Sequence, residues 1–207
     1  MHAPALPFAL PLIAILRGIT PDEVHAHVGA LVDEGYDAIE IPANSPAWTH
    51  SVRIAADAFG DRARVGAGTV LTNEDVDALL AAGGRLMVTP NTRPPVIRHA
   101  VDRGLQVAAG VATASEAFDA LEAGAQMLKL FPASVYGPAM VRALRSVLSP
   151  VPLFAVGGVT PDTLSGYLSA GCQGAGIGGE LYTPGQPVER TREQARRFRQ
   201  AYLDHAA

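Results

Sequence analysis

The chain has 207 residues, of which 48% are hydrophobic and 17% are charged, whereas roughly 25% of residues are charged in an average soluble protein. This balance excludes a disordered chain and supplies enough apolar side chains for a large core and an oligomer face. The formal net charge of −4 argues against a nucleic-acid binder, because such proteins usually carry a basic patch. Cys172 is the single cysteine, which excludes a disulfide framework and a cysteine-based zinc site.

The first sixteen residues are mostly apolar and precede Arg17. Pro4, Pro7 and Pro11 interrupt this stretch, which is shorter than the roughly 18 apolar residues that a membrane span needs. It also lacks the basic start and the small-residue cleavage site of a signal peptide. We therefore expect no membrane association and a cytoplasmic location.

Eight short apolar runs alternate with longer segments of helical periodicity. The runs lack strict polar alternation, which is typical of parallel strands buried on both faces. In chain order they cover residues 12–17, 38–42, 64–70, 86–90, 107–111, 127–132, 153–159 and 174–179.

The intervening segments carry helix start and stop signals. Threonine N-caps are predicted at Thr20, Thr72 and Thr160, and glycines such as Gly35 and Gly104 stand where helices are expected to end. Eight strand–helix units without a break in composition predict a compact (β/α)8 TIM barrel, one domain spanning residues 1–207. An open doubly wound sheet is the alternative. The last helix, near residues 188–205, is rich in arginine and is expected to form a solvated outer face.

Lys129 is the only lysine, and it lies in the apolar run 127–132. A lysine is rarely buried without a partner, so its side chain has three interpretations. It pairs with a core carboxylate, it extends from the strand end to solvent, or it is an amine whose pKa burial lowers until it becomes nucleophilic. Its place near the carboxyl end of the predicted sixth strand favours the third, because barrel active sites lie at that end.

Two further charged residues are expected at the same end of the barrel. Glu40 lies inside the apolar run 38–42, where a carboxylate either pairs with Arg17 or Lys129 or moves protons beside the amine. Arg17 closes the first strand, and its guanidinium suits a carboxylate or a phosphate.

Glycine clusters follow the last two predicted strands. Gly157 and Gly158 follow the seventh strand, and Gly178 and Gly179 follow the eighth. Barrels commonly bind a phosphate there through backbone N–H groups. Thr69 ends the third strand and places a hydroxyl at the same face.

The sequence gives little support for a metal site or a cofactor. The histidines fall mostly in predicted helices or near the termini, and no metal-ligand spacing is present. Cys172 follows a glycine at a predicted helix end and is interpreted as a small apolar core residue.

Several motifs, in the same order, resemble those of the class I aldolases that cleave 2-keto-3-deoxy-6-phospho sugar acids or 4-hydroxy-2-oxoglutarate. The resemblance covers nearly the whole chain. Within this family the chain is most similar to the branch that acts on the galactonate epimer, because Asn44 and Val156 stand where gluconate enzymes typically carry arginine and threonine. The motifs are Leu12–Gly18, Glu40–Pro42, Gly66–Leu71, Val88–Asn91, Lys129–Pro132 and Gly157–Gly158.

The resemblance implies cleavage of 2-dehydro-3-deoxy-6-phosphogalactonate to pyruvate and glyceraldehyde 3-phosphate. It assigns Lys129 as the Schiff-base lysine and Glu40 as the proton donor and acceptor. It places Arg17 and Thr69 on the pyruvate-derived end and the backbone of four glycines on the phosphate, namely Gly157, Gly158, Gly178 and Gly179.

The resemblance also implies a homotrimer that needs no metal and no cofactor. Two positions depart from the family pattern: Gly179 replaces a common serine, and Ala109 replaces the proline before Gly110. The alternatives are a gluconate-epimer or 4-hydroxy-2-oxoglutarate aldolase, and a barrel that binds phosphorylated ligands without Schiff-base chemistry.

Overall fold

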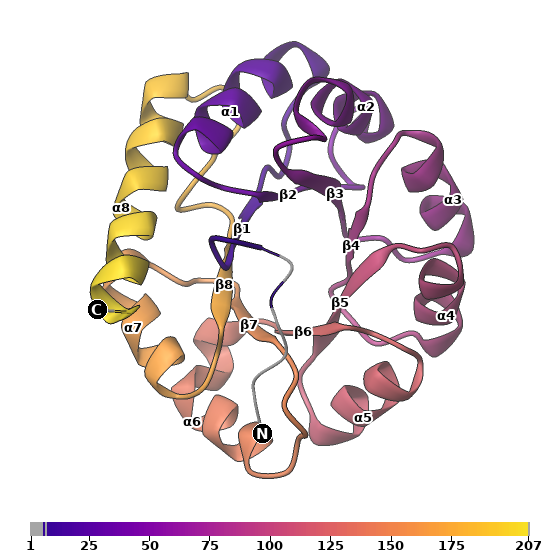
Figure 1. The fold of residues 1–207 in the computed structure, drawn as a ribbon, viewed down its shortest axis with the longest axis vertical. Helices are drawn as coiled ribbons and strands as arrows, with labels where there is room; N and C mark the ends of the chain where they lie inside the picture. Colours follow the sequence, from indigo (N-terminus) through magenta and orange to yellow (C-terminus); the bar gives the residue numbers. More distant parts are fainter. Residues whose placement is uncertain (1–5, 7, 207) are drawn as a thin grey trace.

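The computed structural model describes residue 6 and residues 8–206, and residues 1–5, 7 and 207 lie outside this description. The described chain forms a closed barrel of eight parallel strands in sequential order (Figure 1). Strand β1 pairs with both β2 and β8, so the sheet closes on itself. The predicted TIM barrel is confirmed. The strands are β1 (Leu12–Ile15), β2 (Ala38–Pro42), β3 (Arg64–Gly68), β4 (Leu86–Val88), β5 (Gln106–Val111), β6 (Met127–Leu130), β7 (Leu153–Val156) and β8 (Gly174–Ile177).

Most strands end earlier than the apolar runs that predicted them. The run 12–17 exceeds β1 by two residues, and the run 64–70 exceeds β3 by the same number. The apolar pattern continues because residues such as Leu16 and Val70, which follow the last residue of the strand, are still fully buried. As a result, Arg17 and Thr69 belong to loops at the carboxyl end of the barrel.

A helix follows every strand. The predicted threonine N-caps are confirmed at α1, α3 and α7, and Gly35 adopts a left-handed φ of 89° directly after α1. Helix α6 is broken at Gly137, whose φ of 65° and ψ of 176° are not helical. The helices are α1 (Pro21–Asp33), α2 (Trp48–Phe59), α3 (Asn73–Ala81), α4 (Pro94–Asp102), α5 (Ala114–Glu122), α6 (Ala133–Arg145), α7 (Pro161–Ser169) and α8 (Val188–Ala206).

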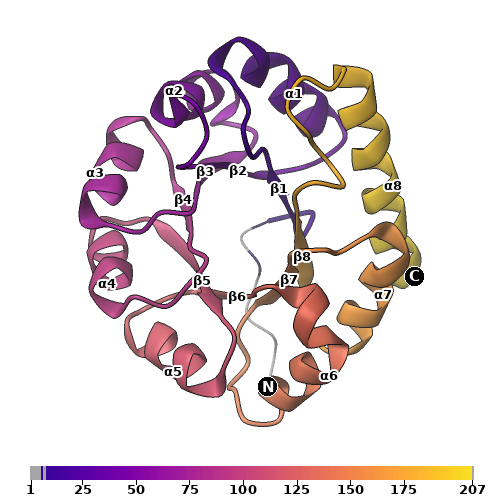
Figure 2. The ribbon, with the colours of Figure 1, turned by 180° about the vertical axis from the view of Figure 1, so that it is seen from behind.

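Alternation along the strands divides the core into two layers. In β6, Leu128 and Leu130 pack outward in the larger cluster between sheet and helices, whereas Met127 belongs to a smaller cluster inside the barrel. Phe8 joins this inner cluster and packs edge-on against Phe154, with ring centroids 6.3 Å apart. Residues 8–11 thereby lie across one end of the barrel (Figure 1), and Figure 2 views the opposite end.

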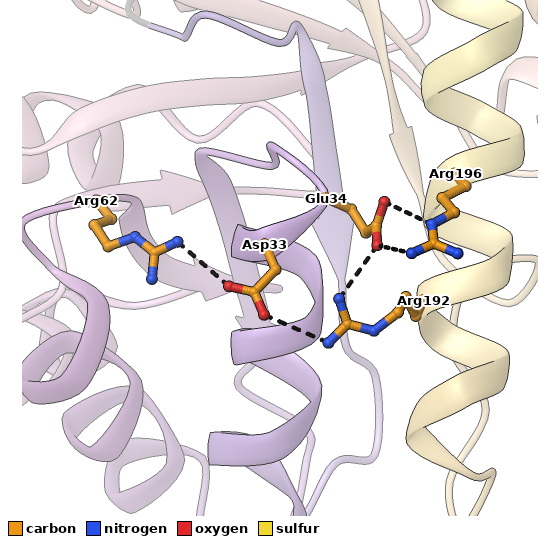
Figure 3. Close-up of polar contacts among 5 residues, drawn as sticks. All are labelled: Asp33, Glu34, Arg62, Arg192 and Arg196. Atoms are coloured by element: carbon orange, nitrogen blue, oxygen red, sulfur yellow. Dashed lines mark hydrogen bonds and ion pairs between the residues drawn. The ribbon is translucent and has the colours of Figure 1, made fainter.

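Helix α8 is held against α1 by ion pairs (Figure 3). Glu34, at the end of α1, accepts hydrogen bonds from both Arg192 and Arg196, and Asp33 bridges Arg192 and Arg62. The prediction of a solvated outer face therefore holds for only one side of α8. Its other side is buried through Thr191, Ala195 and Phe198. No helix in the described part of the chain is both long and apolar enough to span a membrane.

Candidate active site

Lys129 points into the barrel near the carboxyl end of β6. It lies two residues after the inward-facing Met127, and its backbone is in register with Gly110 on β5 and Phe154 on β7. The side chain is only 5% exposed. The interpretation of a lysine that extends to solvent is therefore wrong, because the barrel wall encloses the amine.

The surroundings of the amine favour its neutral form. Burial lowers the pKa of Lys129 below its ordinary value, Glu40 opposes this shift, and the positive charge of Arg17 adds to it. The ring of Phe131 covers the amine, with Nζ 5.0 Å from the ring centroid. A neutral amine is the form that attacks a ketone.

Glu40 lies in β2, where its side chain points into the barrel as that of Lys129 does, and it is 1% exposed. Burial raises the pKa of its carboxyl group, although the charges of Lys129 and Arg17 pull it down. Glu40 Oε2 has no hydrogen-bond partner among the described residues. A raised pKa favours the protonated form of a carboxyl group, which is the form that can donate a proton.

The alternative of a structural ion pair at Glu40 finds no support in the geometry. Among the described residues, no side-chain nitrogen of Lys129 or Arg17 lies within 4.0 Å of a Glu40 oxygen. The three groups are nevertheless close enough to shift each other's pKa values. This arrangement suits proton transfer to a bound molecule better than a permanent salt bridge.

A cleft of about 160 Å³ opens next to the lysine. Six of the eight predicted site residues line it, whereas Glu40 and Thr69 do not. Larger hollows of about 250 to 450 Å³ in the described part of the chain contain no lysine and no buried carboxylate. The lining residues are Ile15, Arg17, Lys129, Phe131, Val156, Gly157, Gly158, Gly178 and Gly179.

Arg17 is held at the rim of this cleft by the loop after β2. Its Nη1 donates a 2.7 Å hydrogen bond to Asn44 Oδ1, and the next backbone N–H, of Gly18, donates to Ser45 Oγ at 2.9 Å. The guanidinium therefore has a fixed orientation with donors left over for an anionic group.

Thr69 lies in the loop directly after β3 and is half-buried. Its φ of 55° is in the left-handed region, which is rare for a β-branched residue. Such backbone strain persists only where the surrounding structure enforces it, and it is concentrated at functional sites.

The glycine side of the cleft presents main chain rather than side chains. Gly157 and Gly158 have φ values of 96° and 74°. A Cβ on Gly158 would lie 2.6 Å from Ser134 Oγ, whereas a Cβ on Gly179 would meet nothing within 4 Å. Bare main chain from two neighbouring strand ends suits an anion that is bound through N–H groups.

The family model described as KDPG and KHG aldolase matches residues 8–194. The chain belongs to this aldolase family. A curated relative from Escherichia coli strain K12, named 2-dehydro-3-deoxy-6-phosphogalactonate aldolase, is 59% identical over 94% of this chain and 96% of its own. A solved structure described as native KDPGal superposes with a TM-score of 0.96 at 56% identity, and the match covers 97% of this chain and 98% of the other.

A second solved structure is a cube-shaped, porous protein cage designed by fusing symmetric oligomeric domains. It matches with a TM-score of 0.94 at 57% identity, over 96% of this chain and 74% of the cage chain. Members of the KDPG and KHG aldolase family are carbon–carbon lyases, so the expected enzyme class is confirmed.

Sequence reasoning assigned no role to two residues that the structure places at the cleft of this aldolase. Phe131 covers the lysine, and Ile15 lines the cleft beside it. The spacing of both residues could have indicated this, because each lies two residues from an inward-facing side chain and side chains two apart on a strand share a face. Within the described residues, no group of three or more His, Cys, Asp or Glu side chains could hold a metal ion.

Proposed function

We propose that the protein is a class I aldolase that cleaves 2-dehydro-3-deoxy-6-phosphogalactonate to pyruvate and glyceraldehyde 3-phosphate. One observation carries the proposal: the only lysine is a buried amine with a lowered pKa, and a buried carboxyl group lies close enough to shift that pKa. The amine also lines a cleft that Arg17 and the bare main chain of four glycines line as well.

The first step forms a Schiff base on Lys129. The neutral Nζ attacks the C2 ketone and gives a carbinolamine, and Glu40 moves protons between nitrogen and oxygen. Glu40 then donates a proton to the C2 hydroxyl, which leaves as water, and an iminium remains. Burial supports both roles, since it lowers the pKa of the amine and raises the pKa of the carboxyl group, which favours the neutral form of each.

The second step breaks the C3–C4 bond. The Glu40 carboxylate accepts the proton of the C4 hydroxyl, and C4 becomes the aldehyde of glyceraldehyde 3-phosphate. The electron pair of the broken bond moves into the iminium and forms an enamine. Protonation at C3 followed by attack of water releases pyruvate and regenerates the free amine. Every proton that Glu40 gains in one step is returned in another.

The two anionic ends of the substrate are assigned to different groups that line the cleft. Arg17, oriented by Asn44, suits the C1 carboxylate, because its remaining N–H groups can donate in parallel. The main-chain N–H groups near Gly157, Gly158, Gly178 and Gly179 suit the phosphate. We also assign Thr69 to the pyruvate-derived end, supported by its strained backbone at the same face of the barrel.

The galactonate epimer is preferred because the 59% identical relative carries that name. Val156 lines the cleft next to the glycine pair and is placed to contact the substrate. The gluconate epimer and 4-hydroxy-2-oxoglutarate remain the competing substrates, since the matched family includes enzymes named for both. Measuring kcat/KM on both C4 epimers decides between them, and we expect Val156→Thr to shift the ratio toward the gluconate epimer.

Borohydride reduction in the presence of pyruvate tests the Schiff base. We expect a stable adduct on Lys129, identified by peptide mass spectrometry, and none in Lys129→Ala. Lys129→Arg is a matched control that keeps a long basic side chain but cannot form the adduct. An enzyme that cleaves the substrate without a trappable adduct, or full activity in Lys129→Ala, would favour a phosphate-binding barrel without Schiff-base chemistry.

We further propose a homotrimer in which residues 1–207 of each chain form a single barrel domain. The support for oligomers is the similar chain in a cage designed from symmetric oligomeric domains. Light scattering of the purified protein measures the subunit number.

We also propose a cytoplasmic location, because a substrate with two anionic groups does not cross a membrane unaided, and cell fractionation tests it.

A further inference from the structure

The carboxylate of Glu23 joins two loops at the mouth of the barrel. Glu23 lies in the first turn of α1, and its Oε2 accepts hydrogen bonds from Thr20 N at 3.2 Å and Thr20 Oγ1 at 2.8 Å, at the end of the loop after β1. Across the gap, Tyr182 donates to Oε2 at 3.4 Å and Gly185 N donates to Oε1 at 3.2 Å. Both of these donors belong to the loop between β8 and α8.

No other helix-capping acid with this local pattern makes such a cross-loop contact in the described part of the chain. Glu116 occupies the equivalent position in α5 and accepts from Ala112 N, Thr113 N and Thr113 Oγ1, all just before its own helix. Both acids accept hydrogen bonds from the residues that begin their helices, but only Glu23 also accepts hydrogen bonds from a second loop. Helix capping alone does not account for these contacts.

The loop that Glu23 contacts begins with the two glycines assigned to the phosphate. Its first turn is closed by hydrogen bonds from Leu181 N and Tyr182 N to Gly178 O. Tyr182 is 2% exposed and packs against His27 of α1 with ring centroids 5.0 Å apart. The tyrosine therefore connects the glycine main chain directly to the Glu23 carboxylate.

The two loops are also in close steric contact. A Cβ on Gly18 would lie 2.8 Å from Pro184 Cγ, so the segment next to Arg17 packs against the loop after β8. Gly179 itself has open space beside it, since a Cβ there would meet nothing within 4 Å. Main-chain N–H groups bind an anion well only when their orientation is fixed before binding.

We infer that Glu23 is a positioning residue that fixes the loop carrying Gly178 and Gly179 relative to the loop carrying Arg17. This inference rests on the proposed function, because it assumes that the phosphate binds at these glycines. Glu23 touches no reacting atom in this scheme. It sets the spacing between the groups that bind the two anionic ends of the substrate.

Two alanine variants, Glu23→Ala and Glu116→Ala, distinguish the effect of positioning the loop from the effect of capping a helix. In Glu23→Ala we expect kcat/KM on the phosphorylated substrate to fall about tenfold, mainly through KM, because the phosphate amides lose their fixed orientation. The rate of borohydride trapping with pyruvate, which needs only Lys129 and the carboxylate end, stays within about twofold of the wild-type rate. Glu116→Ala removes an equivalent cap and leaves both measurements within about twofold of the wild type.

Tyr182→Phe is a third variant, because it removes one cross-loop hydrogen bond and leaves the cap of α1 intact. We expect the same selective rise in KM, by about two- to fivefold. Equal losses in Glu23→Ala and Glu116→Ala, an equal fall in pyruvate trapping, or unchanged KM in both Glu23→Ala and Tyr182→Phe would overturn the inference. Failure of the wild-type enzyme to trap pyruvate on Lys129 would instead overturn the proposed function.

Discussion

Gly68 on β3 and Glu40 on β2 are in such close contact that a Cβ on Gly68 would lie 2.5 Å from Glu40 Oε1 and 2.7 Å from Oε2. Real Cβ atoms do not approach so closely, so the missing side chain at Gly68 provides the space that the carboxylate occupies. Gly68 is paired with Pro42 in the β2–β3 register. The neighbouring strand thus determines where the Glu40 carboxylate lies.

Gly68→Ala therefore displaces the Glu40 carboxylate. We expect kcat to fall about a hundredfold, because a displacement of about 1 Å at a catalytic group has that effect. Steady-state kinetics measure the loss, and circular dichroism verifies the fold. Gly166→Ala is the matched control, since its new Cβ would meet only Pro138 Cγ at 3.7 Å. Comparable activity in the two variants would contradict the steric argument.

Glu40→Gln lowers the pKa of Lys129 further. The Glu40 charge raises this pKa against the effect of burial, so its removal disfavours the ammonium form. Cyanate reacts only with neutral amines, and Lys129 is the only lysine. The pH profile of its carbamylation, followed by mass spectrometry, reaches half-maximum below pH 10.5 in the wild type and at still lower pH in the variant. A shift to higher pH would contradict the assigned environment.

Asn44→Ala releases the Arg17 guanidinium from its 2.7 Å hydrogen bond. We expect the concentration of pyruvate that gives half-maximal borohydride trapping to rise about fivefold, as the loss of one hydrogen bond of about 1 kcal/mol implies. The phosphate end is not in contact with Asn44, so inhibition by inorganic phosphate stays unchanged. A change in phosphate inhibition without a change in pyruvate trapping would show that Asn44 acts at the other end of the cleft.

Phe8→Ala removes the side chain that closes the amino-terminal end of the barrel. Phe8 is 4% exposed and packs against Phe154, so we expect the free energy of unfolding to fall by about 3 kcal/mol. Phe118→Ala is the matched control because Phe118 is 44% exposed, and it costs less than about 1 kcal/mol. Urea denaturation measures both, and equal midpoints would refute the closing role of Phe8.

Glu34→Gln weakens the attachment of α8 to α1. Burial raises the pKa of Glu34, but the hydrogen bonds from Arg196 and Arg192 outweigh this effect and lower it overall. We expect a loss of about 1 kcal/mol at neutral pH, because both arginines are partly solvated.

The stability that this carboxylate contributes is fully present above pH 4.5, its unfolded value, and disappears as the pH falls through the lower folded value. The difference in unfolding free energy between wild type and Glu34→Gln therefore vanishes in acid. Glu193→Gln, on the exposed side of α8, is the control. A difference that persists in acid would rule out charge as its source.

Local patterns in the amino-acid sequence were sufficient to predict the barrel. Short apolar runs, threonine N-caps such as Thr72 and glycine stops such as Gly35 specify strands and helices from neighbouring residues alone. Eight such units in a row leave few arrangements that bury every strand on both faces. The same patterns placed Lys129 and Glu40 at strand ends, and the motifs around them gave the family.

Only the tertiary structure decided how the residues at those strand ends meet. Whether Glu40 pairs with Lys129 or stays unpaired depends on distances across the barrel, which the register and closure of the strands set. The hydrogen bond from Arg17 to Asn44 and the bridge from Glu23 to Tyr182 join residues 27 and 159 positions apart. Local periodicity carries no information at such separations, because it reflects only interactions between near neighbours along the chain.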